Sequence, residues 1–249
     1  MSGSKDFSDL DYEAFRKLAQ DQSLSRYERI GFPDSYRQGY EAAIFADIRR
    51  KLPALDGSAC QVLDIGPGVS ELPDMLIDLC AQRGHTLYLV DSPEMLAQLP
   101  ERPFIRKTEG LFPRCADKLG DLQGRVDAAI SYSVLHYAYV DTNLFGFLDA
   151  ALSMLAPGGR LLLGDVPNVS MRRRFFASGA GQRFHRDFMK TDEAPVVEHN
   201  RLEAGKIDDA VVLGLLARAR AAGFDAYVLP QTPDLPMANR REDLLFLRP

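Results

Sequence analysis

The sequence predicts a doubly wound α/β fold, in which a mostly parallel sheet of seven strands has helices on both faces. From residues 60 to 166, short apolar runs alternate with amphipathic helical patterns, which is typical of parallel strands joined by helical crossovers. Near the end of the chain, apolar runs at 225–230 and 242–249 have no helix between them. We therefore expect the last strand to be antiparallel to its neighbours.

The chain begins with an extension, residues 1–54, that we expect to be helical and to fold over the domain as a lid. Its helix spans about 34–52, because Asp34 or Ser35 can supply an N-cap oxygen and Pro53 marks the end. The domain that follows, 55–249, contains all seven expected strands. They are placed at 60–65, 85–91, 103–107, 125–132, 159–166, 225–230 and 242–249.

The helices of the domain are expected between these strands, at 69–83, 93–99, 141–155 and 208–222. Asp141 is the expected N-cap of the third. The alternation stops at about 167–206, which we expect to be an irregular insertion that serves as a lid. Forty residues without regular structure in a compact domain indicate either a functional lid or helices that the pattern does not reveal.

Composition excludes several classes of protein. A net charge of −5 over 249 residues and a pI near 5.4 argue against a broad nucleic-acid surface. No apolar run approaches the roughly 18 residues of a membrane span. The first residues lack the pattern of a secretory signal, and Cys60, Cys80 and Cys115 have no CxxC spacing. We expect a cytoplasmic protein with neither disulfides nor a metal site.

The most informative motif is VLDIGPGVS, residues 62–70, at the junction of the first strand and the first helix of the domain. Gly66 and Gly68 allow a tight turn and a close approach to a ligand. A dinucleotide site would place a third glycine where Glu71 stands, and an acid beside a pyrophosphate is unfavourable. The motif therefore favours a cationic or zwitterionic ligand such as S-adenosylmethionine. Asp91, at the end of the second strand, can accept hydrogen bonds from ribose hydroxyls.

Four segments together resemble the class I S-adenosylmethionine-dependent methyltransferases of the small-molecule type. They are VLDIGPGVS, the strand ending in LVD, RVDAAISYSVLHY and LAPGGRLLLGD, within about 55–166. Ser70 stands where that family often has the last glycine of a GxGxG motif. The resemblance implies a Rossmann-like fold and an S-adenosylmethionine site. The residues implied for that site are Asp64, Gly66, Pro67, Gly68, Asp91, Ser92, Thr108, Glu109, Gly110, Ser131, Ser133 and His136.

The resemblance also implies methyl transfer to a small-molecule acceptor, which we expect to be an oxygen, for instance on a sugar. Ser131-Tyr132-Ser133-Val134 stands where methyltransferases of nucleic-acid bases carry an Asn/Asp-Pro-Pro-aromatic motif, so no nucleic-acid acceptor is expected. A general base is required only if an acceptor hydroxyl must lose its proton. The candidates are His136, Tyr137 and Asp165. His136 could instead cap the loop or contact only the cofactor, and Asp165 could orient the acceptor or bond the following loop.

Acceptor binding is expected in the aromatic and basic segments outside the motifs. The candidates are Tyr27, Tyr36, Arg172, Arg183 and His185. The arginines of 171–190 could instead form a solvated face or the interface of a homodimer. One alternative function is a non-catalytic binding or assembly protein of the same fold. An NAD-dependent oxidoreductase is a further alternative, which Glu71 opposes.

Overall fold

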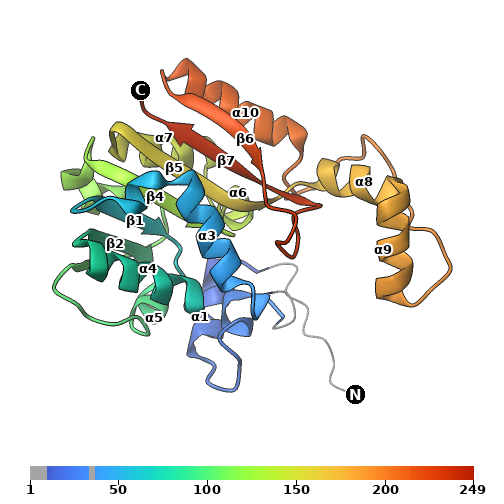
Figure 1. Cartoon of the computed structure of the whole chain (residues 1–249), viewed down its shortest axis with the longest axis horizontal. Helices are drawn as coiled ribbons and strands as arrows, with labels where there is room; N and C mark the ends of the chain where they lie inside the picture. Colours follow the sequence, from blue (N-terminus) through green and yellow to red (C-terminus); the bar gives the residue numbers. More distant parts are fainter. Residues whose placement is uncertain (1–9, 34–36) are drawn as a thin grey trace.

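The computed structural model describes residues 10–33 and 37–249, and in it a mixed sheet runs through the body of the protein with helices against both faces (Figure 1). The order of the strands is β3-β2-β1-β4-β5-β7-β6. Their bounds are β1 Gln61–Ile65, β2 Thr86–Asp91, β3 Ile105–Glu109, β4 Val126–Tyr132, β5 Leu155–Pro167, β6 Asp225–Pro230 and β7 Arg241–Leu247.

The pairing of the strands confirms the predicted topology. β1 pairs in parallel with β2 and β4, β2 with β3, and β4 with β5. β7 lies between β5 and β6 and is antiparallel to both. The seven predicted strands are all present, although β5 begins at Leu155, ahead of the predicted 159.

Both faces of the sheet are buried because successive side chains of a strand point to opposite sides. Leu161 and Leu163 of β5 belong to the apolar cluster that includes α7 and α10, whereas Leu162 belongs to the cluster that includes α3 and α4. The helices of the domain are α3 Glu41–Lys51, α4 Glu71–Arg83, α5 Pro93–Leu96, α6 Leu135–Asp141, α7 Leu144–Met154 and α10 Asp209–Ala221, with 3₁₀ turns η2 Pro53–Asp56 and η3 Ala116–Leu122.

The N-terminal extension is attached to the domain at the level of the cavity described below. It contains α1, Tyr12–Gln20, and η1, Glu28–Ile30. The Tyr12 amide donates to Asp141 Oδ2 at 2.9 Å, and the Arg16 guanidinium pairs with Glu94 at 2.7 Å. The predicted caps of the next helix, Asp34 and Ser35, lie outside the described residues, and α3 begins only at Glu41.

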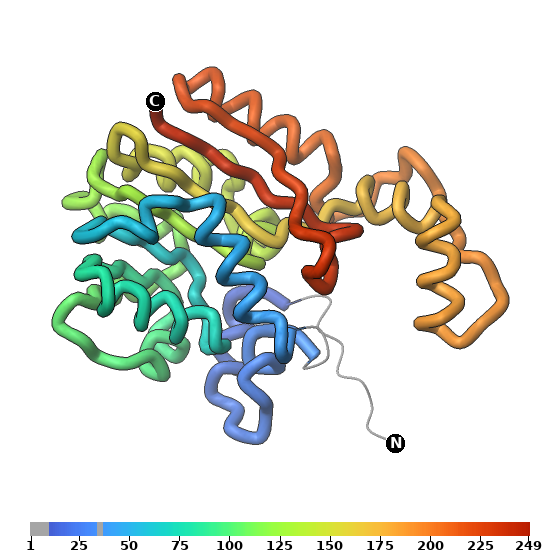
Figure 2. Tube along the Cα trace, in the orientation of Figure 1, coloured from blue at the N-terminus to red at the C-terminus, as the bar shows by residue number. Residues whose placement is uncertain are grey.

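Two local predictions are corrected by the structure. Asp141 does not cap α7: it ends α6, a helix that was not predicted, and the side chain of Asn143 caps α7 through the Gly146 amide at 2.9 Å. The segment 167–206 is not irregular throughout, because it contains α8, Val169–Ala177, and α9, Gly179–Met189. We call 168–206 the arm, and Figure 2 shows it standing out from the body.

The physical reason for the missed arm helices is that their apolar side chains do not face the sheet. Phe175, Phe176, Phe184 and Phe188 contact one another across α8 and α9 instead. Phe184 and Phe188 are four residues apart and so share a face of α9, but Phe184 meets the phenylalanines of α8 and not the sheet. No helix in the described part of the chain has the length and apolar character needed to cross a bilayer.

Candidate functional site

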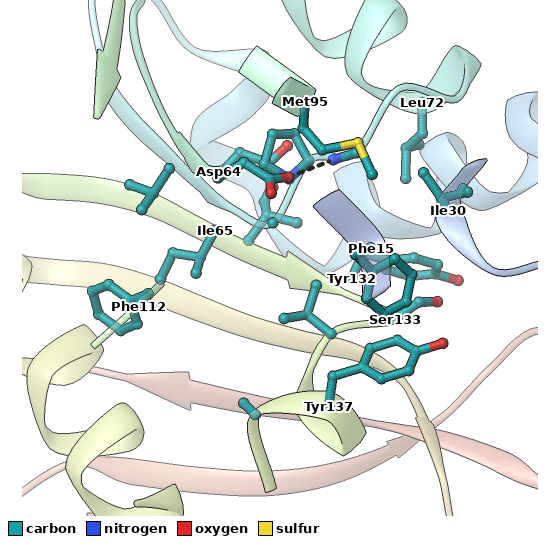
Figure 3. A pocket seen from close by; sticks show the side chains of 18 of the residues that line it. Phe15, Ile30, Asp64, Ile65, Leu72, Met95, Phe112, Tyr132, Ser133 and Tyr137 are labelled. Atoms are coloured by element: carbon teal, nitrogen blue, oxygen red, sulfur yellow. Dashed lines mark hydrogen bonds between the residues drawn. The ribbon is translucent and has the colours of Figure 1, made fainter. Parts of the chain in front are cut away.

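A deep cavity lies at the carboxyl ends of β1, β2 and β4 (Figure 3). The strand order reverses between β1 and β4, and the crevice at such a reversal is where open α/β sheets bind ligands. The cavity has a volume of about 140 Å³. Its walls carry the aromatic side chains Tyr12, Phe15, Phe32, Phe45, Phe112, Tyr132, Tyr137 and Phe147.

The floor of the cavity is the loop from β1 to α4, and two glycines make its shape possible. Gly66 has φ +76° and Gly68 has φ +63°, which L side chains rarely adopt. A Cβ at Gly66 would lie 2.6 Å from Val134 Cγ2, and one at Gly68 would lie 2.8 Å from Ile30 Cγ2. The loop is therefore held between the start of α6 and the N-terminal extension, with no room for a side chain at either glycine.

Asp91, the last residue of β2, is tied to this loop. Its Oδ2 accepts from the Gly68 amide at 3.1 Å and its Oδ1 from the Ser92 amide at 2.7 Å. Burial raises the pKa of Asp91 to about 6, although these two amides act to lower it. Each oxygen of a carboxylate can accept more than one hydrogen bond, so Asp91 retains capacity for a ligand in the cavity.

Asp64 is a second carboxylate on the cavity wall, and the residue is 6% exposed. Within the described part of the chain, no donor or cation bonds to this side chain. Burial and, secondarily, the charge of Asp91 raise the pKa of Asp64 to about 8. Two acids that have no cationic partner among the described residues favour a ligand that donates hydrogen bonds or carries positive charge, and they oppose a phosphate.

The other end of the site is a charged network at the ends of β4 and β5. Asp165 accepts from Arg37 at 3.0 Å and from Arg241 at 2.6 Å, and it also bonds the Ser133 hydroxyl. Burial would raise the pKa of Asp165, but Arg241 and Arg37 outweigh it and hold that pKa below its ordinary value. Ser133 and Asp165 have φ +61° and φ +57°, so both backbones adopt the left-handed conformation in order to meet here.

A buried second carboxylate supports this network from behind. Asp243 Oδ1 accepts from the Asp165 amide at 2.8 Å and from Gln231 at 3.1 Å, and its Oδ2 accepts from Lys51 at 2.6 Å. Asp243 is fully buried, and Lys51 gives it a cationic partner. Buried charges are tolerated when they are paired and hydrogen-bonded, as these are.

Solved structures share this architecture. A CurJ carbon methyltransferase matches 95% of the chain, over 67% of its own length, with a TM-score of 0.54 and 17% identity. A SAM-dependent methyltransferase from Aquifex aeolicus matches 97% of the chain and 100% of its own length, with a TM-score of 0.52 and 13% identity. The chain has the fold of the S-adenosylmethionine-dependent methyltransferases. No protein-family model and no curated sequence matches it.

The methyltransferase fold brings most of the residues expected at the cofactor site to the cavity wall. Those that line it are Asp64, Gly66, Pro67, Gly68, Asp91, Gly110 and Ser133. Ser92 and Ser131 lie just behind the wall: the Ser92 hydroxyl caps α5 through the Met95 amide at 3.3 Å, and the Ser131 hydroxyl donates to the Ile65 carbonyl at 3.0 Å. Thr108 and Glu109 line a separate shallow hollow beside Lys118.

The three candidates for a general base differ in their surroundings. Tyr137 lines the cavity, and burial raises its pKa to about 12. His136 does not line it; its ring lies 3.9 Å from that of Tyr137, its Nδ1 has no partner, and burial lowers its pKa to about 3. Asp165 lies behind Ser133 and is occupied by two guanidinium groups.

The residues expected to bind the acceptor do not gather at the cavity. Tyr27 packs against Phe32 and Met237 and is not part of the lining, and Tyr36 lies outside the described residues. Arg172 and His185 line a hollow within the arm, where Glu203 pairs with Arg172, and Arg183 is exposed on α9.

Arg37, Phe15 and Phe32 line the cavity and were not singled out from the sequence. The available signal was the concentration of arginines and aromatic residues between 25 and 37.

Proposed function

We propose that this protein is an S-adenosylmethionine-dependent methyltransferase that acts on a small molecule. One observation carries the proposal: Asp64 is a buried carboxylate without a partner among the described residues, on a cavity wall that it shares with Asp91 and the two positive-φ glycines. A zwitterionic ligand with an ammonium group and ribose hydroxyls meets the needs of both acids. A pyrophosphate meets neither, and this opposes the oxidoreductase alternative.

The residues present fit the cofactor. Asp91 would accept from the ribose hydroxyls, and Asp64 would attract the ammonium group of the amino-acid part. Gly66 and Gly68 would let the backbone approach the ligand closely. When bound, the cofactor supplies a methyl group on a positively charged sulfur, which is already activated toward nucleophiles.

On the acceptor side, we propose that catalysis comes from orientation and exclusion of water rather than from a strong base. An oxygen remains the acceptor atom that we favour. Tyr137 stays protonated at neutral pH and would donate a hydrogen bond to the acceptor, because its pKa is raised to about 12. A pKa of about 3 makes His136 a weak base, and Asp165 is held by Arg37 and Arg241. An acidic acceptor oxygen therefore suits the site better than a sugar hydroxyl.

The first experiment is a parallel calorimetric titration with S-adenosylmethionine, S-adenosylhomocysteine and NAD. We expect micromolar binding of the two adenosyl ligands and none of NAD. Asp91→Asn should weaken S-adenosylhomocysteine binding, whereas Asp78→Asn, at an exposed position of α4, should leave it unchanged. NAD binding without adenosyl binding would overturn the proposal. Adenosyl binding with no methyl transfer to any acceptor would favour a non-catalytic binding protein.

We also propose that a second copy of the chain covers the arm. Phe188 and Met189 on α9 are 61% and 58% exposed, and 171–190 carries six basic residues and one acidic residue in a chain of net charge −5. A basic, partly apolar arm suits the acidic body of another copy. Sedimentation velocity tests this: Phe188→Ser should shift a dimer toward monomer, and a wild-type monomer at all concentrations would contradict it.

A further inference from the structure

Arg37 is the buried cation of the cavity. It comes from the N-terminal extension, is 4% exposed, and lines the cavity beside Tyr132 and Ser133. In Figure 3 these two neighbours lie on the side of Phe15 and Tyr137, apart from Asp64 and Met95. The cavity thus has an acidic end, at Asp64 and Asp91, and a basic end at Arg37.

The position of the Arg37 guanidinium is fixed by contacts on one side. Its Nη2 donates to the Ser133 hydroxyl and to Asp165. Its central carbon lies 4.6 Å from the centre of the Phe32 ring and 5.3 Å from that of Tyr132. Stacking on aromatic faces and a carboxylate contact together hold an arginine in one orientation.

The rest of the guanidinium is available. A guanidinium has five N–H donors, and Nη2 accounts for two of them. Within the described part of the chain, no acceptor bonds the donors on Nε and Nη1. Because Arg37 lines the cavity, an acceptor that enters the cavity can bond these donors.

The local charge also favours an anion at this end. Asp165 is shared by Arg37 and Arg241, while Asp243 behind it is paired with Lys51. Lys51 also pairs with the buried Asp47, which balances the network farther back, but around Asp165 itself two guanidinium groups share one carboxylate. The positive charge also acts on the Tyr137 hydroxyl. Burial raises the pKa of that hydroxyl, while Arg241 and Arg37 lower it more strongly than Asp165 raises it.

The surfaces next to Arg37 are aromatic rings. Phe15, Phe32, Tyr132 and Tyr137 line the cavity, and Phe15 meets Tyr137 edge to face with centres 4.6 Å apart. Flat apolar surfaces of this kind bind a planar ring better than a polyol, whose hydroxyls would find few partners there.

We propose that Arg37 recognises the methyl acceptor, and that the acceptor is a planar organic anion whose carboxylate or ionised acidic hydroxyl accepts a hydrogen bond from a free donor on Nε or Nη1. This inference rests on the proposed function, because it takes the acidic end of the cavity as the cofactor end. Nε–H and Nη1–H lie on different edges of the guanidinium, so an oxygen of the anion accepts a charge-assisted hydrogen bond from one of them.

The test is calorimetric binding of three anions, each with its neutral amide, to the protein saturated with S-adenosylhomocysteine. The probes are benzoate, 4-hydroxybenzoate and indole-3-acetate, with benzamide, 4-hydroxybenzamide and indole-3-acetamide, at millimolar concentration. We expect at least one anion to bind about tenfold or more tightly than its amide. Arg37→Gln should abolish that preference. Arg106→Gln, an exposed arginine of β3 whose guanidinium bonds only backbone carbonyls, should preserve it.

Folding is monitored by thermal unfolding, because Arg37→Gln leaves Asp165 with one guanidinium fewer. Should that variant fail to fold, the wild-type comparison of acid with amide decides alone. The inference is overturned if S-adenosylhomocysteine binds but no anion outcompetes its amide, or if folded Arg37→Gln keeps the preference. Absence of S-adenosylhomocysteine binding overturns the proposed function instead, so the two failures are distinguishable.

Discussion

The affinity of this protein for S-adenosylhomocysteine should depend on the ionisation of Asp64. Burial and the charge of Asp91 raise the pKa of Asp64 from 3.8 to about 8, so in the ligand-free protein it is roughly nine-tenths protonated near pH 7. An ammonium group in the cavity favours the ionised form. Binding must therefore expel a proton at neutral pH, and affinity should rise with pH.

The size of the effect follows from the same value. For a site with a pKa of about 8, the ionised fraction rises roughly fiftyfold between about pH 6 and pH 8, which corresponds to about 2 kcal/mol of binding free energy. Asp91, with a pKa of about 6, adds about a factor of two. The sign for stability is opposite: because the folded pKa of Asp64 lies above the unfolded value, the ligand-free protein loses stability as pH rises through that range.

The assay is calorimetry with S-adenosylhomocysteine at several pH values, in pairs of buffers with different ionisation enthalpies, which counts the protons released. Near pH 7 the wild type should release close to one proton, and near pH 9 almost none. Asp64→Asn resembles the protonated form, so it should fold normally, bind weakly and release no proton from this site. The reasoning would be refuted if the wild type released no proton near pH 7, or if Asp64→Asn released as many protons as the wild type.

Three further predictions concern the same cavity. Gly68→Ala should cost about 2–4 kcal/mol of folding free energy, because φ is +63° and the new Cβ would lie 2.8 Å from Ile30. Gly84→Ala, at φ +69° but with open space around the new Cβ, should cost only about 1–2 kcal/mol. Urea unfolding of both variants separates the cost of the contact from the cost of backbone strain. Asp91→Asn should weaken S-adenosylhomocysteine binding by about 1–3 kcal/mol in calorimetry, and an unchanged affinity would remove Asp91 from the ribose site; thermal unfolding checks the fold, because Asn can accept from only one of the two backbone amides. Arg183→Gln, on the exposed face of the arm, should leave cofactor and anion binding unaltered. A loss of either would show that the arm contributes to the binding site.

The sheet could be predicted from the sequence because each strand is encoded by contiguous residues. An apolar run such as 125–132 is buried on both faces, and the helix that follows a strand can be recognised by apolar residues along one of its faces. Prediction failed for helices that do not show such an apolar face toward the sheet in their sequence. α6 is only seven residues long and begins three residues after the end of β4, and the arm helices pack their phenylalanines against one another rather than on the sheet.

The two ends of the cavity differ in the same way. The acidic end consists of Asp64, Gly66 and Gly68, within five residues, together with Asp91 one strand later, so spacing alone indicated it. The basic end is assembled from remote segments: Arg37 bonds Asp165, 128 positions away, and Arg241 joins them from the last strand.

No periodicity relates these three residues, and only the strand order places β5 beside β7 so that Arg241 reaches Asp165. The methyltransferase fold explains this division. The acidic end is built from loops of the sheet, while the basic end depends on side chains from the extension and the final strand. The free donors of Arg37, from which we infer the chemistry of the acceptor, are therefore evident only in the three-dimensional structure.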